Sequence, residues 1–324
     1  MPCEISNDVS AAANLIRSGE LVAFATETVY GLGANALNPE AVARIFEVKQ
    51  RPHFDPLIVH IADISQLEEI TISFSDQAQK LAERFWPGPL TLVLPKKSVI
   101  PDLVTSGLDS VAIRIPSHPI ARELLQLAQV PIAAPSANKF GCLSPTQAHH
   151  VSEQLGDEIK MILDGGPCTV GVESTVLQCS DESPVLLRPG GITLEEIEAC
   201  AGPVRIAKIE EHAEANSPLS PGMLPRHYAP GTRLLLIDQP EQMPDSKNIG
   251  ILSLNPIEKT FLSDQHFAAE EILSPEGDLR AAAAKLFTAL RNLDQAGVDY
   301  IVALRMPETG LGRTINNRLE RAAF

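Results

Sequence analysis

The sequence predicts an α/β protein built on a mixed sheet, followed by a second and smaller α/β unit. Short apolar runs typical of strands alternate with amphipathic segments typical of helices through the first 200 residues. The composition then shifts near residue 205, and a new series of strand-like and helix-like segments begins. With 324 residues, of which 44% are hydrophobic, the chain is long enough for one large or two ordinary domains.

The elements of the first half follow from apolar periodicity and from flanking residues. Pro39 is well placed to begin a helix, because its missing N–H would be unpaired there in any case. From Pro39 the spacing of Val42 and Ile45 carries a helix through Lys49 and turns Lys49 onto or beside the buried face. Further helices are expected at 8–18, 76–85, 119–129, 146–155 and 194–200. Strands are expected at 21–25, 57–62, 90–95, 111–115, 131–135, 161–164, 172–179 and 184–188.

We expect a domain over 1–205, a linker over 206–232 and a small, Rossmann-like α/β domain over 233–324. The proline, glycine and serine content of 208–231 predicts the linker. Because the linker also contains His227 and Tyr228, its residues 217–231 are expected to fold over a ligand as a lid; the alternative is a plain tether. In the last domain we expect strands at 234–237, 249–254 and 300–304 and a helix near 278–295.

The charge of the chain bears on its ligands. The net charge is −15, and residues 1–200 carry 13 lysines and arginines against 25 aspartates and glutamates. An acidic surface repels nucleic acid at long range, so an anionic ligand must be held by a local group of cations. The simpler explanation of the acidity is that it only confers solubility.

Several segment types are absent from the sequence. No apolar run approaches the ~20 residues that span a bilayer. The N-terminus lacks the basic and apolar regions of a secretory signal. The five cysteines are scattered and odd in number, and none forms a Cys-x-x-Cys pair. We therefore expect free thiols in a cytoplasmic protein, without structural zinc and without membrane attachment.

Polar and cationic patches lie beside the strand-like runs. The first patch is Lys49 with Arg51, the second is Ser136 with Asn138, and the third is the segment 144–146. Cations, hydroxyls and amides gathered at strand ends suit a phosphate-bearing ligand. Each patch alone also has a structural explanation, because cations stabilise helix C-termini and Ser and Asn often cap turns.

Two arginines and a histidine belong to strand-like runs. Arg114 lies within such a run and either forms an internal salt bridge or clamps a carboxylate or phosphate, since arginine is rarely buried without an anionic partner. Arg188 precedes two glycines, which either let backbone approach a ligand closely or form a simple turn. His60 lies inside an apolar run, where a histidine is more often a core residue than a ligand.

In this order, the motifs resemble the threonylcarbamoyl-AMP synthase family in its long form. In that form a YrdC-like domain, a twisted, mixed, open sheet with a concave ligand crevice, is followed by a linker and a small C-terminal domain. The resemblance covers nearly the whole chain. It rests on the motifs Thr26–Leu32, Lys49-x-Arg51, Pro56–His60, Trp86–Thr91, Ser136-x-Asn138, Ser144–Thr146, Leu187–Gly190, Ser220–Met223, His227–Pro230, Gly310–Gly312 and Asn317–Leu319.

The resemblance implies an enzyme, a nucleotidyltransferase that makes threonylcarbamoyl-adenylate from L-threonine, bicarbonate or CO2, and ATP, and releases pyrophosphate. Mg²⁺ is implied on the phosphates of ATP, without direct ligands from the protein. The product would pass to a threonylcarbamoyl transferase that modifies an adenosine of tRNA, and a weak direct contact with tRNA is a further option.

The resemblance also assigns residues to two ligands. The implied L-threonine contacts are Thr28, His60, Arg114, Ala134 and Ser174. The implied ATP contacts are Lys49, Arg51, Asp55, Ser110, Ser136, Asn138, Ser144, Arg188, His227 and Tyr228. Lys49 and Arg51 would stabilise charge on the phosphates, and no side chain is nominated as a nucleophile.

Three positions depart from the pattern of the family. Gln50 stands where the family usually has glycine, Asp55 where it usually has asparagine, and Phe140 where it usually has serine. An acid near phosphate is unfavourable unless it faces magnesium or a ribose hydroxyl.

Two other functions are weighed against this one. The first is a non-catalytic module that binds double-stranded RNA or tRNA, which the acidic first 200 residues oppose. The second is O-carbamoyl transfer in hydrogenase maturation, which expects acylphosphatase and zinc-finger segments that are not visible in the sequence.

Overall fold

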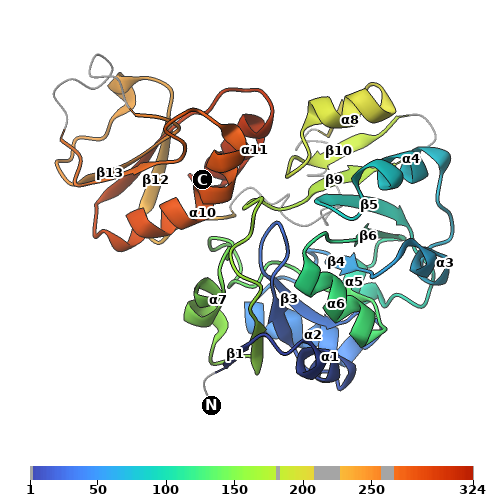
Figure 1. Ribbon diagram of the computed structural model, residues 1–324. Coiled ribbons are helices and arrows are strands. Elements are labelled where there is room, and N and C mark those ends of the chain that lie inside the picture. Colours follow the sequence, from blue (N-terminus) through green and yellow to red (C-terminus); the bar gives the residue numbers. More distant parts are fainter. Residues whose placement is uncertain (1–2, 180–182, 208–226, 257–265, 324) are drawn as a thin grey trace. The chain divides into compact units, whose positions relative to one another are not determined.

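The computed structural model describes residues 3–179, 183–207, 227–256 and 266–323 in two units (Figure 1). The first unit comprises Met1–Phe140, Pro145–Thr169 and Glu173–Met223. The second comprises Gly141–Ser144, Val170–Val172 and Leu224–Phe324. Two short segments that are surrounded in the sequence by residues of the first unit are therefore part of the second unit.

The first unit is built on an eleven-stranded sheet with the strand order β1-β8-β2-β3-β7-β4-β6-β5-β9-β10-β11. Its strands are β1 (Glu4–Ser6), β2 (Val22–Phe24), β3 (Gly31–Asn35), β4 (Ile58–His60), β5 (Leu90–Pro95), β6 (Ser110–Arg114), β7 (Ile132–Ala133), β8 (Met161–Leu163), β9 (Thr175–Gln178), β10 (Val185–Arg188) and β11 (Arg205–Ile206). Parallel pairs such as β4–β6 stand beside antiparallel pairs such as β5–β6, so the predicted mixed α/β sheet is confirmed.

Helices cover both faces of this sheet. They are α1 (Val9–Arg17), α2 (Pro39–Lys49), α3 (Leu67–Ile70), α4 (Asp76–Phe85), α5 (Asp102–Thr105), α6 (Pro119–Ala128), α7 (Ala148–Leu155) and α8 (Leu194–Ala201), with a 3-10 turn η1 (Ile64–Gln66). Helices α1 and α6 bury their apolar sides against Phe24 and Ile132 on one face. Helices α2 and α4 bury theirs against Val59 and Ile113 on the other.

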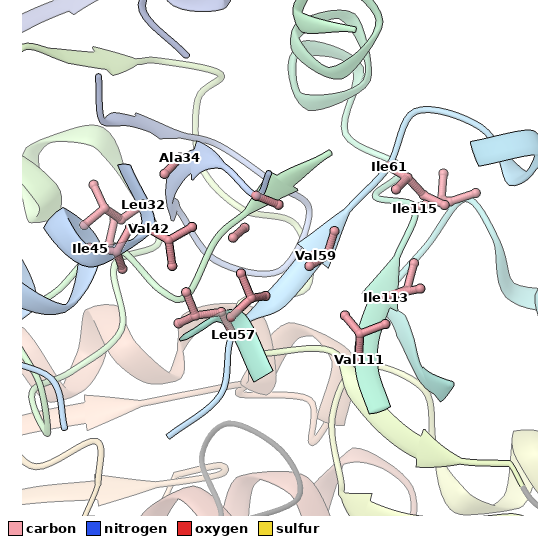
Figure 2. Packing of buried hydrophobic residues seen from close by; sticks show 14 of the residues in the cluster. Leu32, Ala34, Val42, Ile45, Leu57, Val59, Ile61, Val111, Ile113 and Ile115 are labelled. Atoms are coloured by element: carbon pink, nitrogen blue, oxygen red, sulfur yellow. The ribbon is translucent and has the colours of Figure 1, made fainter. Parts of the chain in front are cut away.

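The alternation of side chains along β4 and β6 separates the core from the polar residues. Figure 2 shows Val59 and Ile113 within the core cluster on the α2 side of the sheet. Because neighbouring side chains on a strand point to opposite faces, His60 and Arg114 point away from that cluster. Ala112 lies on the same face as these two, within a smaller apolar group. Strand period alone therefore directs His60 and Arg114 to one face.

The second unit has a four-stranded, wholly parallel sheet in the order β12-β15-β13-β14. Its elements are β12 (Arg233–Ile237), the 3-10 turn η2 (Pro240–Gln242), β13 (Ile249–Ser253), β14 (Ala269–Ile272), α10 (Leu279–Gln295), β15 (Tyr300–Leu304) and α11 (Leu311–Ala322). A Cβ at Gly250 would lie 3.1 Å from Leu293, so this glycine lets α10 pack closely on the sheet. A parallel sheet with helices agrees with the predicted Rossmann-like unit.

Two general features complete the fold. Within the four described ranges, none of the helices is both long enough and apolar enough to cross a membrane. All five cysteines are free thiols.

Candidate active site

Helix α2 positions the first cation. Asn38 caps the helix by accepting hydrogen bonds from two backbone N–H groups of its first turn, and the helix ends at Gln50. Lys49 is only 1% exposed, as its place on the helix predicted. Its Nζ donates to the carbonyl oxygen of Ser136 at 2.6 Å and to that of Asn138. The two polar motifs, far apart in sequence, are thus in direct contact through the ammonium group.

Gln50 is held in a left-handed conformation, with φ 53° and ψ 39°. A non-glycine residue in this backbone conformation destabilises the folded state by about 1 kcal/mol relative to glycine. We therefore expect Gln50→Gly to raise the free energy of unfolding by about 0.5–1 kcal/mol in urea denaturation. Gln50→Val should lower it, because a β-branched side chain is strained further there. A lower unfolding free energy for Gln50→Gly would refute this reading of the helix end.

Arg51 and Asp55 form a buried ion pair. The Nη2 of Arg51 lies 2.8 Å from Oδ2 of Asp55 and donates to the carbonyl of Pro56 at 2.8 Å. Burial raises the pKa of the Asp55 carboxyl, although the charges of Arg51, Lys49 and Arg188 oppose this shift. Arg51 contacts this carboxylate directly, and the charges of Lys49 and Arg188 act on it from a longer distance.

The raised pKa of Asp55 has a consequence for stability. The folded state favours the protonated carboxyl, so its contribution is greatest at low pH and is lost as the pH rises through the folded pKa. Asp55→Asn has no proton to lose. From about pH 4 upward, wild type should lose unfolding free energy relative to Asp55→Asn, as measured by urea denaturation. A difference that is constant with pH would contradict the expected shift.

Arg188 connects the cations to the start of β9. Its Nη2 donates to the carbonyl of Ser174 at 2.9 Å and to Oγ of Ser174 at 3.2 Å. The Oγ of Ser174 is in turn 2.7 Å from Oγ1 of Thr91 at the start of β5. A Cβ at Gly190 would lie 2.3 Å from the backbone of Ser174, so the close backbone approach allowed by this glycine is to the chain itself.

Arg114 lies at the centre of a second buried polar group. Its Nη2 is 2.7 Å from Oε1 of Glu27, its Nη1 donates to Oγ1 of Thr28 at 2.8 Å, and its Nε donates to the carbonyl of Gly88 at 3.2 Å. The internal salt bridge considered for Arg114 is therefore present. His60 is its register partner on β4, and burial together with the charge of Arg114 lowers the pKa of His60 to about 3. His60 is thus neutral at physiological pH.

Three predicted residues lie at the edges of these groups. Ala134 is buried, and its N–H donates to the carbonyl of Ile58 at 2.9 Å. Ser136 is half-buried and pairs with Gly31 in an isolated β-bridge, and Ser110 is half-buried at the start of β6.

Three further predicted ATP contacts, Ser144, His227 and Tyr228, belong to the second unit. Their segments are neighbours within it, because the N–H of Ala229 donates to the carbonyl of Gly141 at 2.8 Å. Tyr228 is buried with φ 62°, and the guanidinium of Arg318 lies 4.9 Å from its ring centroid. The first part of the predicted lid, up to residue 226, lies outside the described residues.

Profiles of known families match the two halves of the chain. A profile described as "Telomere recombination" matches residues 14–190, and one described as "Threonylcarbamoyl-AMP synthase, C-terminal domain" matches residues 192–324. The threonylcarbamoyl-AMP synthase of Bacillus subtilis is 47% identical, over 97% of this chain and 92% of the relative. That of Pyrococcus abyssi is 46% identical, over 97% of this chain and 94% of the relative.

This chain belongs to the threonylcarbamoyl-AMP synthase family. A solved structure of Pyrococcus abyssi Sua5 complexed with L-threonine superposes with a TM-score of 0.89 at 44% sequence identity, covering 97% of this chain and 94% of that chain. The resemblance found in the sequence motifs and the fold class derived from it are both confirmed.

Two polar residues of this family member were missed by sequence reasoning. Glu27 forms the ion pair with Arg114, and Thr91 contacts Ser174. Both lie inside motifs that carried the resemblance, 26–32 and 86–91, but neither has a distinguishing local pattern. A polar residue at an otherwise apolar strand position, as at Thr91 in β5, was the one available signal.

Proposed function

We propose that this member of the threonylcarbamoyl-AMP synthase family is a nucleotidyltransferase that joins L-threonine, CO2 or bicarbonate, and ATP into threonylcarbamoyl-adenylate with release of pyrophosphate. The observation that carries the proposal is the pair of buried polar groups in the first unit. One contains the buried cations Lys49, Arg51 and Arg188, of which Arg51 contacts Asp55, and the other surrounds Arg114. The names of relatives at 46% and 47% identity agree with it.

The two groups suit two ligands held side by side. Arg188 contacts Ser174, which is assigned to threonine, so the cation group assigned to ATP adjoins a residue assigned to the amino acid. Positioning of this kind is the main contribution that an enzyme can make to joining two bound molecules. We propose that Arg51 and Arg188 face the phosphates and that Arg114 with Thr28 faces the threonine carboxylate.

The reaction needs no nucleophile from the protein. The threonine amine attacks CO2 to give a carbamate, a carbamate oxygen attacks the α-phosphorus, and the bond to pyrophosphate breaks. Carbamates are short-lived in water, so burial of the contacting residues is part of the mechanism. Lys49, Arg51 and Arg188 are each at most 6% exposed, and fixed cations in such surroundings stabilise the growing negative charge on pyrophosphate.

Magnesium is proposed to bind with the nucleotide. Among the described residues no group of three or more His, Cys, Asp or Glu side chains is arranged to hold a metal ion. Asp55 is the one acid within the cation group, and Arg51 already contacts it. We therefore propose that the metal is carried on the phosphates of ATP, where it would neutralise charge.

The decisive experiment measures pyrophosphate with the purified full-length chain. Pyrophosphate should form when ATP, L-threonine and bicarbonate are all present, without any RNA, and labelled bicarbonate should appear in an adenylate. Omitting threonine is the matched control. If pyrophosphate forms at the same rate without threonine, or only with RNA, the proposal fails. If no pyrophosphate forms under any of these conditions, the non-catalytic RNA-binding alternative is favoured.

The remaining expectations about partners rest on this activity. An adenylate is a reactive mixed anhydride, so a transferase that accepts the threonylcarbamoyl group onto tRNA is proposed as the consumer of the product. A cytoplasmic location and a weak direct contact with tRNA stay predictions.

A further inference from the structure

We propose that Glu27 is a positioning residue for threonine: it fixes the guanidinium of Arg114 so that Arg114 and Thr28 together receive the carboxylate of the amino acid. The inference rests on the proposed function, in which both of these residues face threonine. Glu27 itself would not touch the substrate.

The geometry around Arg114 supports this role. Three acceptors from two segments hold its guanidinium: Glu27 and Thr28 from the loop after β2, and the carbonyl of Gly88 from the loop before β5. Glu27 is the charged one among them, and its contact is the shortest at 2.7 Å. Because a planar guanidinium binds in a fixed fork, fixing Nη2 against Glu27 also sets the direction of Nη1 toward Thr28.

The burial of the pair strengthens the argument. The side chains of Arg114 and Glu27 are 4% and 6% exposed. Burial raises the pKa of Glu27, but the charge of Arg114 and hydrogen bonds from the backbone N–H groups of Glu27 and Ser117 more than offset it, so the pKa lies below its usual value. The carboxylate is therefore ionised and remains a partner for Arg114 throughout the neutral range.

The charge of the pair also matters for the ligand. Threonine brings both a carboxylate and an amino group, and the amino group must lose its proton before it attacks CO2. An uncompensated buried Arg114 would attract the carboxylate without direction, whereas the ion pair is neutral overall and directional. The charges of Glu27 and Arg114 both act on the pKa of His60, which stays low. His60 is therefore neutral and adds no further charge beside the ion pair.

The test is the kinetic behaviour of Glu27→Gln in the full-length chain. This variant keeps the shape and the hydrogen-bonding oxygen but loses the charge. We expect the KM for threonine to rise by about 10- to 100-fold, while the KM for ATP changes by less than about twofold. Glu27→Asp, which keeps the charge one methylene further back, should recover part of the loss.

A matched control is available at the surface. Glu20 is also paired with two cations, Arg44 at 2.9 Å and Lys160 at 2.7 Å, but lies outside both polar groups. Glu20→Gln should leave both KM values unchanged. If Glu27→Gln does not fold, as judged by circular dichroism, the comparison is made with Glu27→Asp, whose KM for threonine alone should rise.

The outcomes separate this inference from the proposed function. Equal changes in the KM values for threonine and ATP, or an unchanged KM for threonine, would overturn the positioning role while wild type still releases pyrophosphate. If wild type shows no threonine-dependent pyrophosphate release, the proposed function fails first.

Discussion

Replacing Lys49 with methionine should lower the rate of threonine-dependent pyrophosphate release by about 10³-fold. Methionine keeps the apolar stem within the core but removes the ammonium group. That group donates to the carbonyl of Ser136 at 2.6 Å and to the carbonyl of Asn138, so it both organises the Ser-x-Asn turn and brings positive charge to the cation group. Negative charge grows on the leaving pyrophosphate in the transition state. Loss of either contribution would stabilise this transition state less and so slow the reaction.

The control for this variant is Lys97→Met. The Nζ of Lys97 also donates to a backbone carbonyl, that of Glu68, but on the exposed surface of the first unit. Its turnover should match wild type within about twofold. Two carbonyls lose a buried donor in Lys49→Met, which costs about 1–3 kcal/mol of stability, so both variants are assayed below their melting temperatures. Turnover of Lys49→Met within tenfold of wild type would remove Lys49 from the catalytic residues.

The sequence located most elements of the first unit, but β3 is not among the strands that it predicted. β3 contains Gly31 and Gly33, and glycine is depleted in strands. The structure shows why a strand requires them. A Cβ at Gly33 would lie 2.8 Å from the ring of Phe24 and 2.9 Å from Ile132, so neighbouring strands fill the space that a side chain would need. That crowding arises between distant segments and leaves no local pattern.

The second unit shows a related failure at its C-terminal helix. α11 was not predicted, because Asn316, Asn317 and Arg318 interrupt its apolar stripe. Arg318 is fully buried and lies over the ring of Tyr228, a contact that comes from a segment about 90 residues earlier. Apolar periodicity is a guide to buried helices only where the buried face is apolar.

The candidate site was predictable to the extent that a single strand or helix end determined it. The period of α2 placed Lys49 inward, and the rarity of buried arginines without an anionic partner predicted such a partner for Arg114. The partner of Arg114 was left open, since Glu27 is 87 positions away and reaches it only through the sheet order. Ser144 shows the converse limit: its motif was recognised, yet nothing local indicated that it belongs to the second unit.

The largest stability loss is expected at Gly190. An added Cβ there would lie 2.3 Å from the carbonyl carbon of Ser174 and from the N of Thr175, and both are backbone atoms that cannot rotate away. The N–H of Gly191 also donates to the carbonyl of Glu173 at 3.0 Å, so the turn after β10 is tied to the start of β9 on both sides of the added atom. Gly190→Ala should therefore lower the free energy of unfolding by about 3 kcal/mol or more.

The same substitution should affect the site. The turn cannot move away from β9 without moving Arg188, whose Nη2 contacts both the carbonyl and the hydroxyl of Ser174. Folded Gly190→Ala should therefore show a raised KM for ATP, besides its lower melting temperature. Gly231→Ala is the matched control, because its Cβ would make ordinary contacts of 3.5 Å with Asp294, and both properties should stay near wild type. If the two variants lose equal stability, backbone contact at Gly190 does not determine how β10 is joined to β9. If Gly190→Ala is less stable but its KM for ATP is unchanged, Arg188 holds its position independently of the turn that follows it.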